Sequence, residues 1–186
     1  MALMRIDIDG DIGRAADPLV VLSRKRWERA VSTAVNETGR QTLTMAARLV
    51  SKEAGLKART TKKQFALRKS RPSTLTATVV AHGSPIHLVE FGARQTKRGV
   101  SAKAWGKRKT YPGTFIATMA SGKRGVFVRK GAGRLPIRPL YGPGVPGTLA
   151  LEKISQATIA HADERLQTNI ARQLDRAIRK MNGLAG

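Results

Sequence analysis

The sequence contains no cysteine and few aromatic residues. Among its 186 residues are 2 Trp, 2 Tyr and 4 Phe. The absence of cysteine excludes disulfides, thiolate nucleophiles and cysteine-ligated zinc sites. Because aromatic side chains are scarce, the core has to consist mainly of Ala, Val, Leu and Ile. Such a core leaves little reserve stability, which favours the burial of further surface by oligomerisation.

Long hydrophobic runs are also missing. No stretch approaches the roughly 18 apolar residues that a membrane span needs. Near the start, Arg5 is followed by Asp7, Asp9 and Asp11 without an apolar segment, so no secretory signal is visible. We expect a protein without a membrane partner, located in a cytoplasm or in a particle that is assembled there.

Acidic residues are nearly absent from the middle of the chain. Between Ala54 and Leu151, 20 lysines and arginines stand against one acidic residue, Glu90, which gives these 98 residues a formal charge of +19. The whole chain carries +23, so most of the excess charge lies in this part. Such a density repels itself and favours contact with a polyanion or with an acidic protein surface.

Two motifs point weakly to chemistry. Asp7–Asp11 resembles the start of a calcium loop, but Ile12 and Pro18 occupy the positions where such a loop has Gly and Glu. Gly142–Gly147 has the letters G-x-G-x-x-G, yet its two prolines remove backbone donors that a pyrophosphate would use. We interpret the first as an alternating strand and the second as a rigid connector.

Titratable residues form no recognisable catalytic set. His82, His87 and His161 have no cysteine and few acidic residues near them in the sequence, so a metal site lacks ligands. Glu90 has no carboxylate partner for acid/base hydrolysis, and no serine stands in a nucleophile-elbow context. We therefore expect no enzyme and no catalytic, cofactor-binding or metal site.

Hydrophobic periodicity predicts an α+β fold in one domain, with two long helices packed around a small antiparallel sheet and a long basic loop. Asp17 and Pro18 provide a start signal for the first helix, Thr148 a cap for the second, and Gly183 a stop. The expected parts are an N-terminal strand or arm (1–16, with alternation over 4–12), a long helix (17–53), a basic β-rich body (54–147) and a C-terminal helix (148–182).

Within the basic body the pattern predicts several short elements. Turn residues and β-branched runs separate them. The segment 92–113 is rich in Gly and Lys and shows no periodicity, so we expect a long loop there. The other expected elements are a short helix from Thr60 or Thr61 through Leu67, strands at 73–81 and 86–91, a hairpin of 115–119 with 125–129, and an edge strand at 135–140.

Two clusters of basic residues are the candidate contact sites. Lys and Arg contact phosphates without reading sequence, while Trp105 and Tyr111 in the expected 92–113 loop offer weak evidence for base stacking. A solvated surface, or docking on an acidic protein, explains the same charges. The 57–71 cluster is Lys57, Arg59, Lys62, Lys63, Arg68, Lys69 and Arg71, and the 97–109 cluster is Lys97, Arg98, Lys103, Lys107, Arg108 and Lys109.

Several blocks, in order, resemble the prophage minor tail protein Z family. The longest is Leu88–Ala102, which contains Phe-Gly-Ala-Arg-Gln-Thr-Lys and Gly-Val-Ser-Ala. The other blocks are Tyr111–Ala117, Gly125–Arg129, Arg134–Ile137 and Leu140–Pro146. In layout, the resemblance extends over about residues 15 to 180, with flanking helices that match in kind rather than in letters.

The resemblance implies a structural virion protein of a tailed bacteriophage. It implies a tail completion or neck component that forms a ring, expected to be hexameric, at the head-proximal end of the tail. There it would join tail to head around the DNA channel and contact the tail terminator, the connector or the tail tube. We expect the strand and long helices to form the subunit contacts, and the 92–113 loop to face the lumen or a neighbouring ring. The family supplies no catalytic residues.

A free, non-specific nucleic-acid-binding protein is the alternative from a different class. It would explain the basic body equally well. Such a protein should be monomeric or dimeric and bind any DNA with strong salt dependence. A ring component should instead assemble into a discrete multimer with defined protein neighbours.

Overall fold

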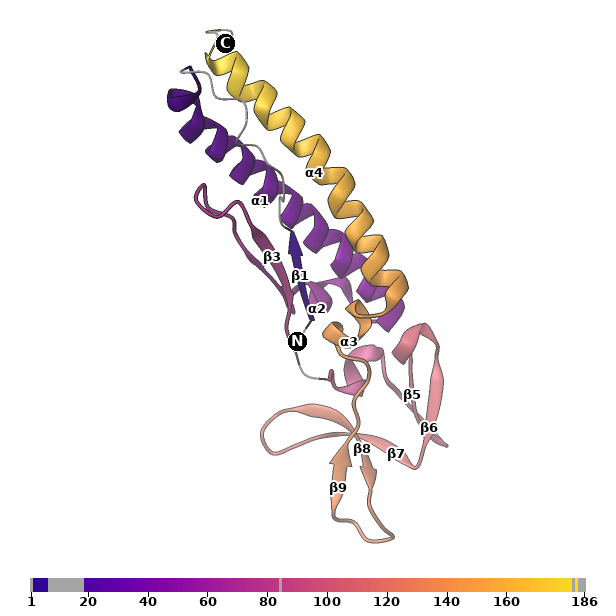
Figure 1. The fold of residues 1–186 in the computed structure, drawn as a ribbon. Coiled ribbons are helices and arrows are strands. Elements are labelled where there is room, and N and C mark those ends of the chain that lie inside the picture. Colours follow the sequence, from indigo (N-terminus) through magenta and orange to yellow (C-terminus); the bar gives the residue numbers. More distant parts are fainter. Residues whose placement is uncertain (1, 7–18, 84, 182, 184–186) are drawn as a thin grey trace.

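A computed structural model describes residues 2–6, 19–83, 85–181 and 183 of the chain (Figure 1). The two predicted long helices are present as α1 (Leu19–Ala54) and α4 (Glu152–Met181), which lie side by side and antiparallel. Together with small antiparallel sheets they confirm the α+β class. The expected cap at Asp17 and Pro18, and residues 7–12 of the expected strand, lie outside the described residues.

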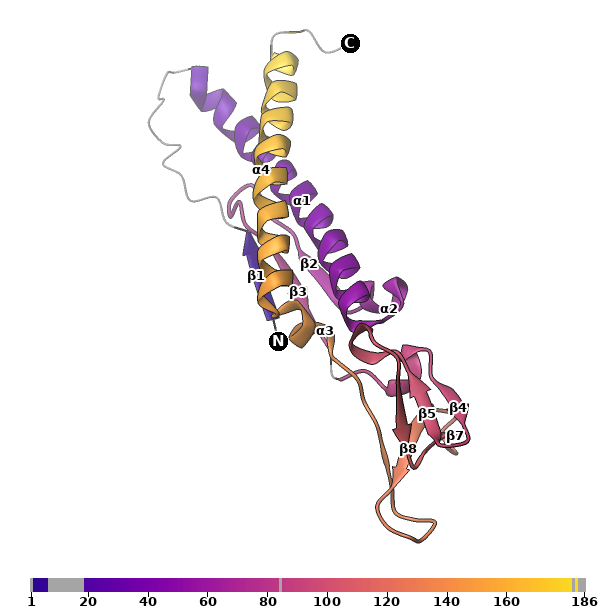
Figure 2. The ribbon, with the colours of Figure 1, turned by 90° about the vertical axis from the view of Figure 1, so that its right-hand side faces the viewer.

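Helix α1 is the central layer of the helical half. It contacts α4 on one side and strands β2 (Phe65–Arg68) and β3 (Ala77–Ala81) on the other (Figure 1). Figure 2 shows the two helices crossing and separating toward the start of α1, while the β-rich body extends from their opposite end. Because both sides of α1 are covered, its buried positions include Val35 and Val50 as well as Thr38 and Thr42.

The N-terminal sheet has the order β1-β3-β2, with β1 at Ala2–Ile6. Both pairings are antiparallel, and Phe65 lies opposite Ala81. Gly39 of α1 meets this sheet closely, since a Cβ there would lie 2.7 Å from Leu67 Cδ1. A glycine at this point therefore lets the helix approach the strand without interrupting the helix.

Two predicted elements of this region are wrong. The short helix stops at Lys62 (α2, Ala58–Lys62), and the segment after it is strand β2, because Phe65 is buried by pairing with β3. The predicted strand at 86–91 is instead a 3-10 helix, η1 (Leu88–Phe91), whose two end residues are both buried. Their spacing of three residues places both side chains on the core side of a 3-10 turn. The strand predicted at 73–81 is present but shorter, since β3 begins at Ala77.

The predicted long loop at 92–113 is also wrong. This segment forms the middle sheet, in the order β4-β5-β6, with β4 at Arg94–Thr96, β5 at Gly99–Ala102 and β6 at Lys109–Pro112. A 3-10 helix, η2 (Ala104–Gly106), stands between β5 and β6. Val100 and Ala102, two positions apart on β5, are both fully buried, because alternate residues of a strand face the same side. This burial stabilises the sheet although each strand is very short.

The distal sheet matches its prediction. Strands β7 (Thr114–Thr118) and β8 (Arg124–Arg129) form the expected hairpin, and β9 (Ile137–Pro139) is the expected edge strand. After it, the helix α3 (Val145–Leu149) precedes α4. The sequence predicts Thr148 as the cap of the C-terminal helix, but Thr148 lies inside α3, where its hydroxyl donates to Gly144 O.

Candidate functional site

The basic residues of the body are all on the surface. Each of the 20 lysines and arginines between Ala54 and Leu151 has an exposed side chain. Within the described part of the chain none of them forms an ion pair, because the ion pairs found there belong to residues of α1 and α4. Among the described residues, the charge of the body is therefore not neutralised by ion pairs.

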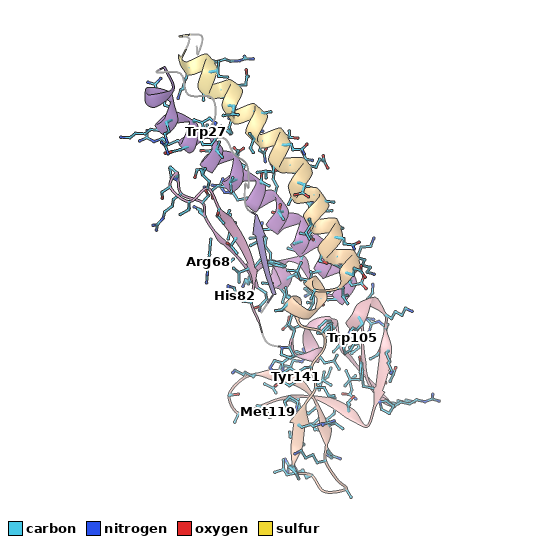
Figure 3. The ribbon with its side chains drawn as sticks, in the orientation of Figure 1. Trp27, Arg68, His82, Trp105, Met119 and Tyr141 are labelled. Carbon is cyan, nitrogen blue, oxygen red and sulfur yellow. The ribbon has the colours of Figure 1, made fainter. Side chains whose placement is uncertain are left out.

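The 57–71 cluster follows α2 and the outer strand of the N-terminal sheet. Arg68 ends β2 and points away from the helices (Figure 3). The turn after it is anchored to α1, since the Asn36 side chain bonds both Ser70 N, at 2.8 Å, and Ser70 O, at 3.0 Å. The buried Ser32 hydroxyl also donates to Ser70 Oγ. The neighbouring cations are thus presented from a fixed turn.

The 97–109 cluster is carried by the middle sheet rather than by a loop. Lys97 and Arg98 form the β4–β5 turn, while Lys103 and Lys107 flank η2. Arg108 differs from the rest, because Nη1 donates to Gly92 O at 3.4 Å and to Ser101 Oγ at 3.3 Å. In the described structure the other five side chains make no hydrogen bond or ion pair, so they remain available to a partner.

The fold brings the start of the 57–71 cluster next to the middle of the 97–109 cluster. Gly55, which follows α1, has a φ of +74° and packs against the carbonyl of Lys103, where a Cβ would lie 2.1 Å from the oxygen. Lys57 of the other cluster comes two residues later. The 57–71 and 97–109 clusters therefore adjoin at the junction between the helices and the β-rich body.

The two aromatic residues of this region have different environments. Trp105 is 59% exposed and has a φ of +54°, a left-handed conformation that is uncommon for a residue other than glycine. Figure 3 places it where the body meets the helices. Tyr111 lies opposite Val100 in the middle sheet and is partly buried, and this burial raises its pKa. Trp105 is thus exposed at the surface, while Tyr111 packs against the core.

Gln95 joins two sheets, a role that the sequence did not indicate. Its Oε1 accepts from Ile116 N at 2.9 Å, and its Nε2 donates to Gly99 O and Thr114 O. The buried Thr114 hydroxyl completes the connection by accepting from Val100 N at 2.9 Å. The middle sheet is therefore fixed to the distal sheet by side-chain to backbone bonds. No spacing or composition signal marks a single glutamine for this task.

A third basic region, at the far end of the distal sheet, was not singled out from the sequence. It surrounds Leu135, whose side chain is 72% exposed. Arg129 stacks over the Phe115 ring, with Cζ 5.4 Å from the ring centroid. We call this region the distal tip and define it as residues 129–138, with the cations Arg129, Lys130, Arg134 and Arg138.

The weak chemical motifs have structural explanations here. Gly142 packs against Phe91, where a Cβ would lie 2.5 Å from the ring, so close packing accounts for this glycine. His87 contacts Tyr141, with ring centroids 4.6 Å apart. Among the described residues, no group of three His, Cys, Asp or Glu side chains gathers as metal ligands would. Nor is any helix in the described ranges long and apolar enough to cross a membrane.

Comparison with known proteins identifies the family. The model of a family described as prophage minor tail protein Z (GPZ) matches residues 12–182, most of the chain. No curated protein and no solved structure matches. The match covers the helices as well as the blocks between Leu88 and Pro146 that carry the resemblance. The chain therefore belongs to the prophage minor tail protein Z family, a family of structural proteins of the bacteriophage tail.

Proposed function

We propose that this protein completes the phage tail at its head-proximal end. In this proposal several copies, six by the symmetry that the resemblance implies, form a ring that joins tail to head around the DNA channel. The observation that carries the proposal is the uncompensated body: 20 exposed cations and no ion pair to any of them in the described residues. A tail protein that surrounds DNA would bind the DNA phosphates with such a surface.

The arrangement of these cations suits DNA that passes through a ring. They stand on short strands, tight turns and a turn anchored to α1, so they are presented at fixed positions. Lys and Arg on such a scaffold contact phosphates of any sequence. Because each contact is weak at physiological salt, DNA is held without being prevented from moving.

The thin core supports assembly with neighbours. Most buried hydrophobic residues of the helical half are Ala and Val, and α4 has one face exposed along its length. Burying that face against another protein adds stability that the single chain lacks. We propose other copies of this chain as the main neighbours, with the tail terminator, the connector or the tail tube above and below, in a particle assembled in the host cytoplasm.

Deleting this gene from its prophage tests the proposal. We expect induced cells to accumulate DNA-filled heads and separate tails, and purified protein to restore joining when added to that lysate. The matched control is protein carrying Ala34→Pro, which places proline inside α1 at a fully buried position and disrupts the helix. Complete, infectious particles in the deletion strain would contradict the proposal.

The exposed charge favours a second candidate, a free nucleic-acid-binding protein. Sedimentation of the purified chain separates the two functions. A ring component assembles into one discrete multimer without DNA. A free binder stays monomeric or dimeric, and its affinity for DNA falls steeply with salt.

A further inference from the structure

We infer that the distal tip of one copy docks on the outer face of α4 of a second copy. The inference rests on the proposed ring and names the surfaces that would form it. Both surfaces are exposed in the described structure, and the charges of their side chains are opposite.

The distal tip combines an apolar side chain with surrounding cations. The connection between β8 and β9 is closed by a hydrogen bond from Lys130 N to Pro136 O at 3.0 Å. It presents Leu135, 72% exposed, among Lys130, Arg134 and Arg138, all three of them exposed. Arginine is one of the residue types that dominate protein interfaces, and burying the exposed Leu135 side chain would add hydrophobic stabilisation. A DNA phosphate backbone offers no apolar surface for Leu135 to pack against, so the leucine favours a protein as the partner of the distal tip.

The outer face of α4 has the complementary composition. Exposed positions one or two helical turns apart place Glu152, Ile159 and Asp163 on this face, with Glu164 beside them. Asp163 and Glu164 pair with no basic side chain among the described residues, and Ile159 is 49% exposed. The nearby Lys153 is occupied, since its Nζ lies 2.8 Å from Glu53 Oε2.

This face is unusual in so basic a chain. Four other carboxylates of the described residues each form an ion pair: Glu28, Glu37, Glu53 and Asp175. Arg172, the cation of one of these pairs, bonds back to Glu37 of α1 and so faces the helix pair rather than the outside. The first half of α4 is therefore the surface where the tip cations would meet unpaired carboxylates.

One copy cannot make this contact with itself. Figures 1 and 2 show the β8–β9 connection at the end of the molecule that points away from the helices. A contact between two different surfaces of identical chains is heterologous, and repeating it gives a ring when the rotation closes. The contact thus provides the head-to-tail interface that a ring requires.

Charge reversal in the full-length chain tests the contact by analytical ultracentrifugation. The tip variant is Lys130→Glu with Arg134→Glu, and the helix variant is Asp163→Lys with Glu164→Lys. Because like charges then face each other, we expect each variant to weaken self-association about 10-fold or more. Combining all four changes restores opposite charges, and we expect association within about 3-fold of the natural chain.

Two further variants separate the contact from general charge effects. Lys123→Glu with Arg124→Glu makes the same charge change at the β7–β8 turn, and we expect association to be unchanged. Leu135→Ser keeps the charge and should weaken association, because the apolar anchor is removed. Circular dichroism at 222 nm confirms that each variant keeps its helices.

The outcomes are distinguishable. Failure of the combined variant to restore association overturns the inference, as does a tip reversal that lowers DNA affinity but leaves association unchanged. If these variants associate normally and still join heads to tails, the docking surfaces are wrong while the proposed function stands. If the natural chain neither associates nor joins heads to tails, both fail.

Discussion

Asn169 of α4 donates a hydrogen bond from Nδ2 to Thr38 Oγ1 of α1 at 3.0 Å, although the two residues are 131 positions apart in the chain. Both side chains are buried, and Nδ2 also lies 3.2 Å from Gln41 Oε1. Next to them, Gln173 Nε2 donates to Glu37 Oε1. Most of the buried apolar side chains of the two helices are small, so apolar packing alone selects an alignment weakly. These polar pairs therefore favour one alignment of α4 against α1.

The first prediction concerns this polar contact. Asn169→Ala removes the donor and leaves the buried Thr38 hydroxyl and the partly buried Gln41 amide without it, so we expect the free energy of unfolding to fall by about 1–3 kcal/mol. Urea denaturation followed by circular dichroism measures the change. Gln167→Ala, at an exposed position of the same helix, is the control and should stay within about 0.5 kcal/mol of the natural chain. Equal stabilities of the two variants would contradict the assignment.

The second prediction concerns the bridge between the middle and distal sheets. Gln95→Ala leaves Ile116 N without its acceptor, and we expect a loss of about 1–2 kcal/mol in the free energy of unfolding. Hydrogen exchange of the Ile116 amide should also become faster, because its bond to the side chain is gone. Lys97→Ala, two residues away in the exposed turn, provides the comparison. Unchanged protection of Ile116 would show that the bridge does not hold the sheets.

The third prediction separates neighbouring cations of the 97–109 cluster. Arg108→Ser removes the guanidinium bonds to Gly92 O and Ser101, whereas Lys107→Ser removes a side chain without partners in the described structure. Since the bonds are long and exposed, we expect Arg108→Ser to cost about 0.5–1.5 kcal/mol of stability. Lys107→Ser should cost less than about 0.5 kcal/mol. Thermal unfolding of both variants measures the two losses. A larger loss for Lys107→Ser than for Arg108→Ser would contradict the structural role of the Arg108 bonds.

The fourth prediction concerns DNA. Replacing Lys62 and Lys63, or Lys97 and Arg98, with serine should lower the affinity for duplex DNA equally for all sequences. The slope of log K against log salt should become shallower by about 0.9 for each phosphate that the variant no longer neutralises. Fluorescence anisotropy over a salt series measures it, with Lys25→Ser on α1, outside the body, as the control. A decrease in affinity that depends on DNA sequence would argue for base readout instead.

The long elements were predictable from the sequence because their patterns are long. Helices α1 and α4 repeat apolar residues over many turns, and the β7–β8 hairpin has a clear turn between two apolar runs. The middle sheet was missed because its strands have three or four residues and its core positions are small. With Val100 and Ala102 as the buried pair, the alternation is too short to stand out among glycines and lysines.

The candidate site was predictable in charge but not in geometry. Composition identified the basic body, and the structure shows that every cation there has an exposed side chain. Sequence adjacency did not indicate that Arg108 bonds Gly92, 16 residues earlier, or that the two clusters adjoin where Gly55 meets Lys103. These relationships arise from tertiary contacts between short elements, for which local propensity carries no signal.

A cryo-electron microscopy map of the phage particle that contains this chain would show where its copies lie and whether they encircle the DNA. We expect a closed ring of copies at the head-proximal end of the tail, with the basic body turned toward the DNA. Density for the chain at the distal end of the tail, or in copies that do not encircle the channel, would contradict this expectation.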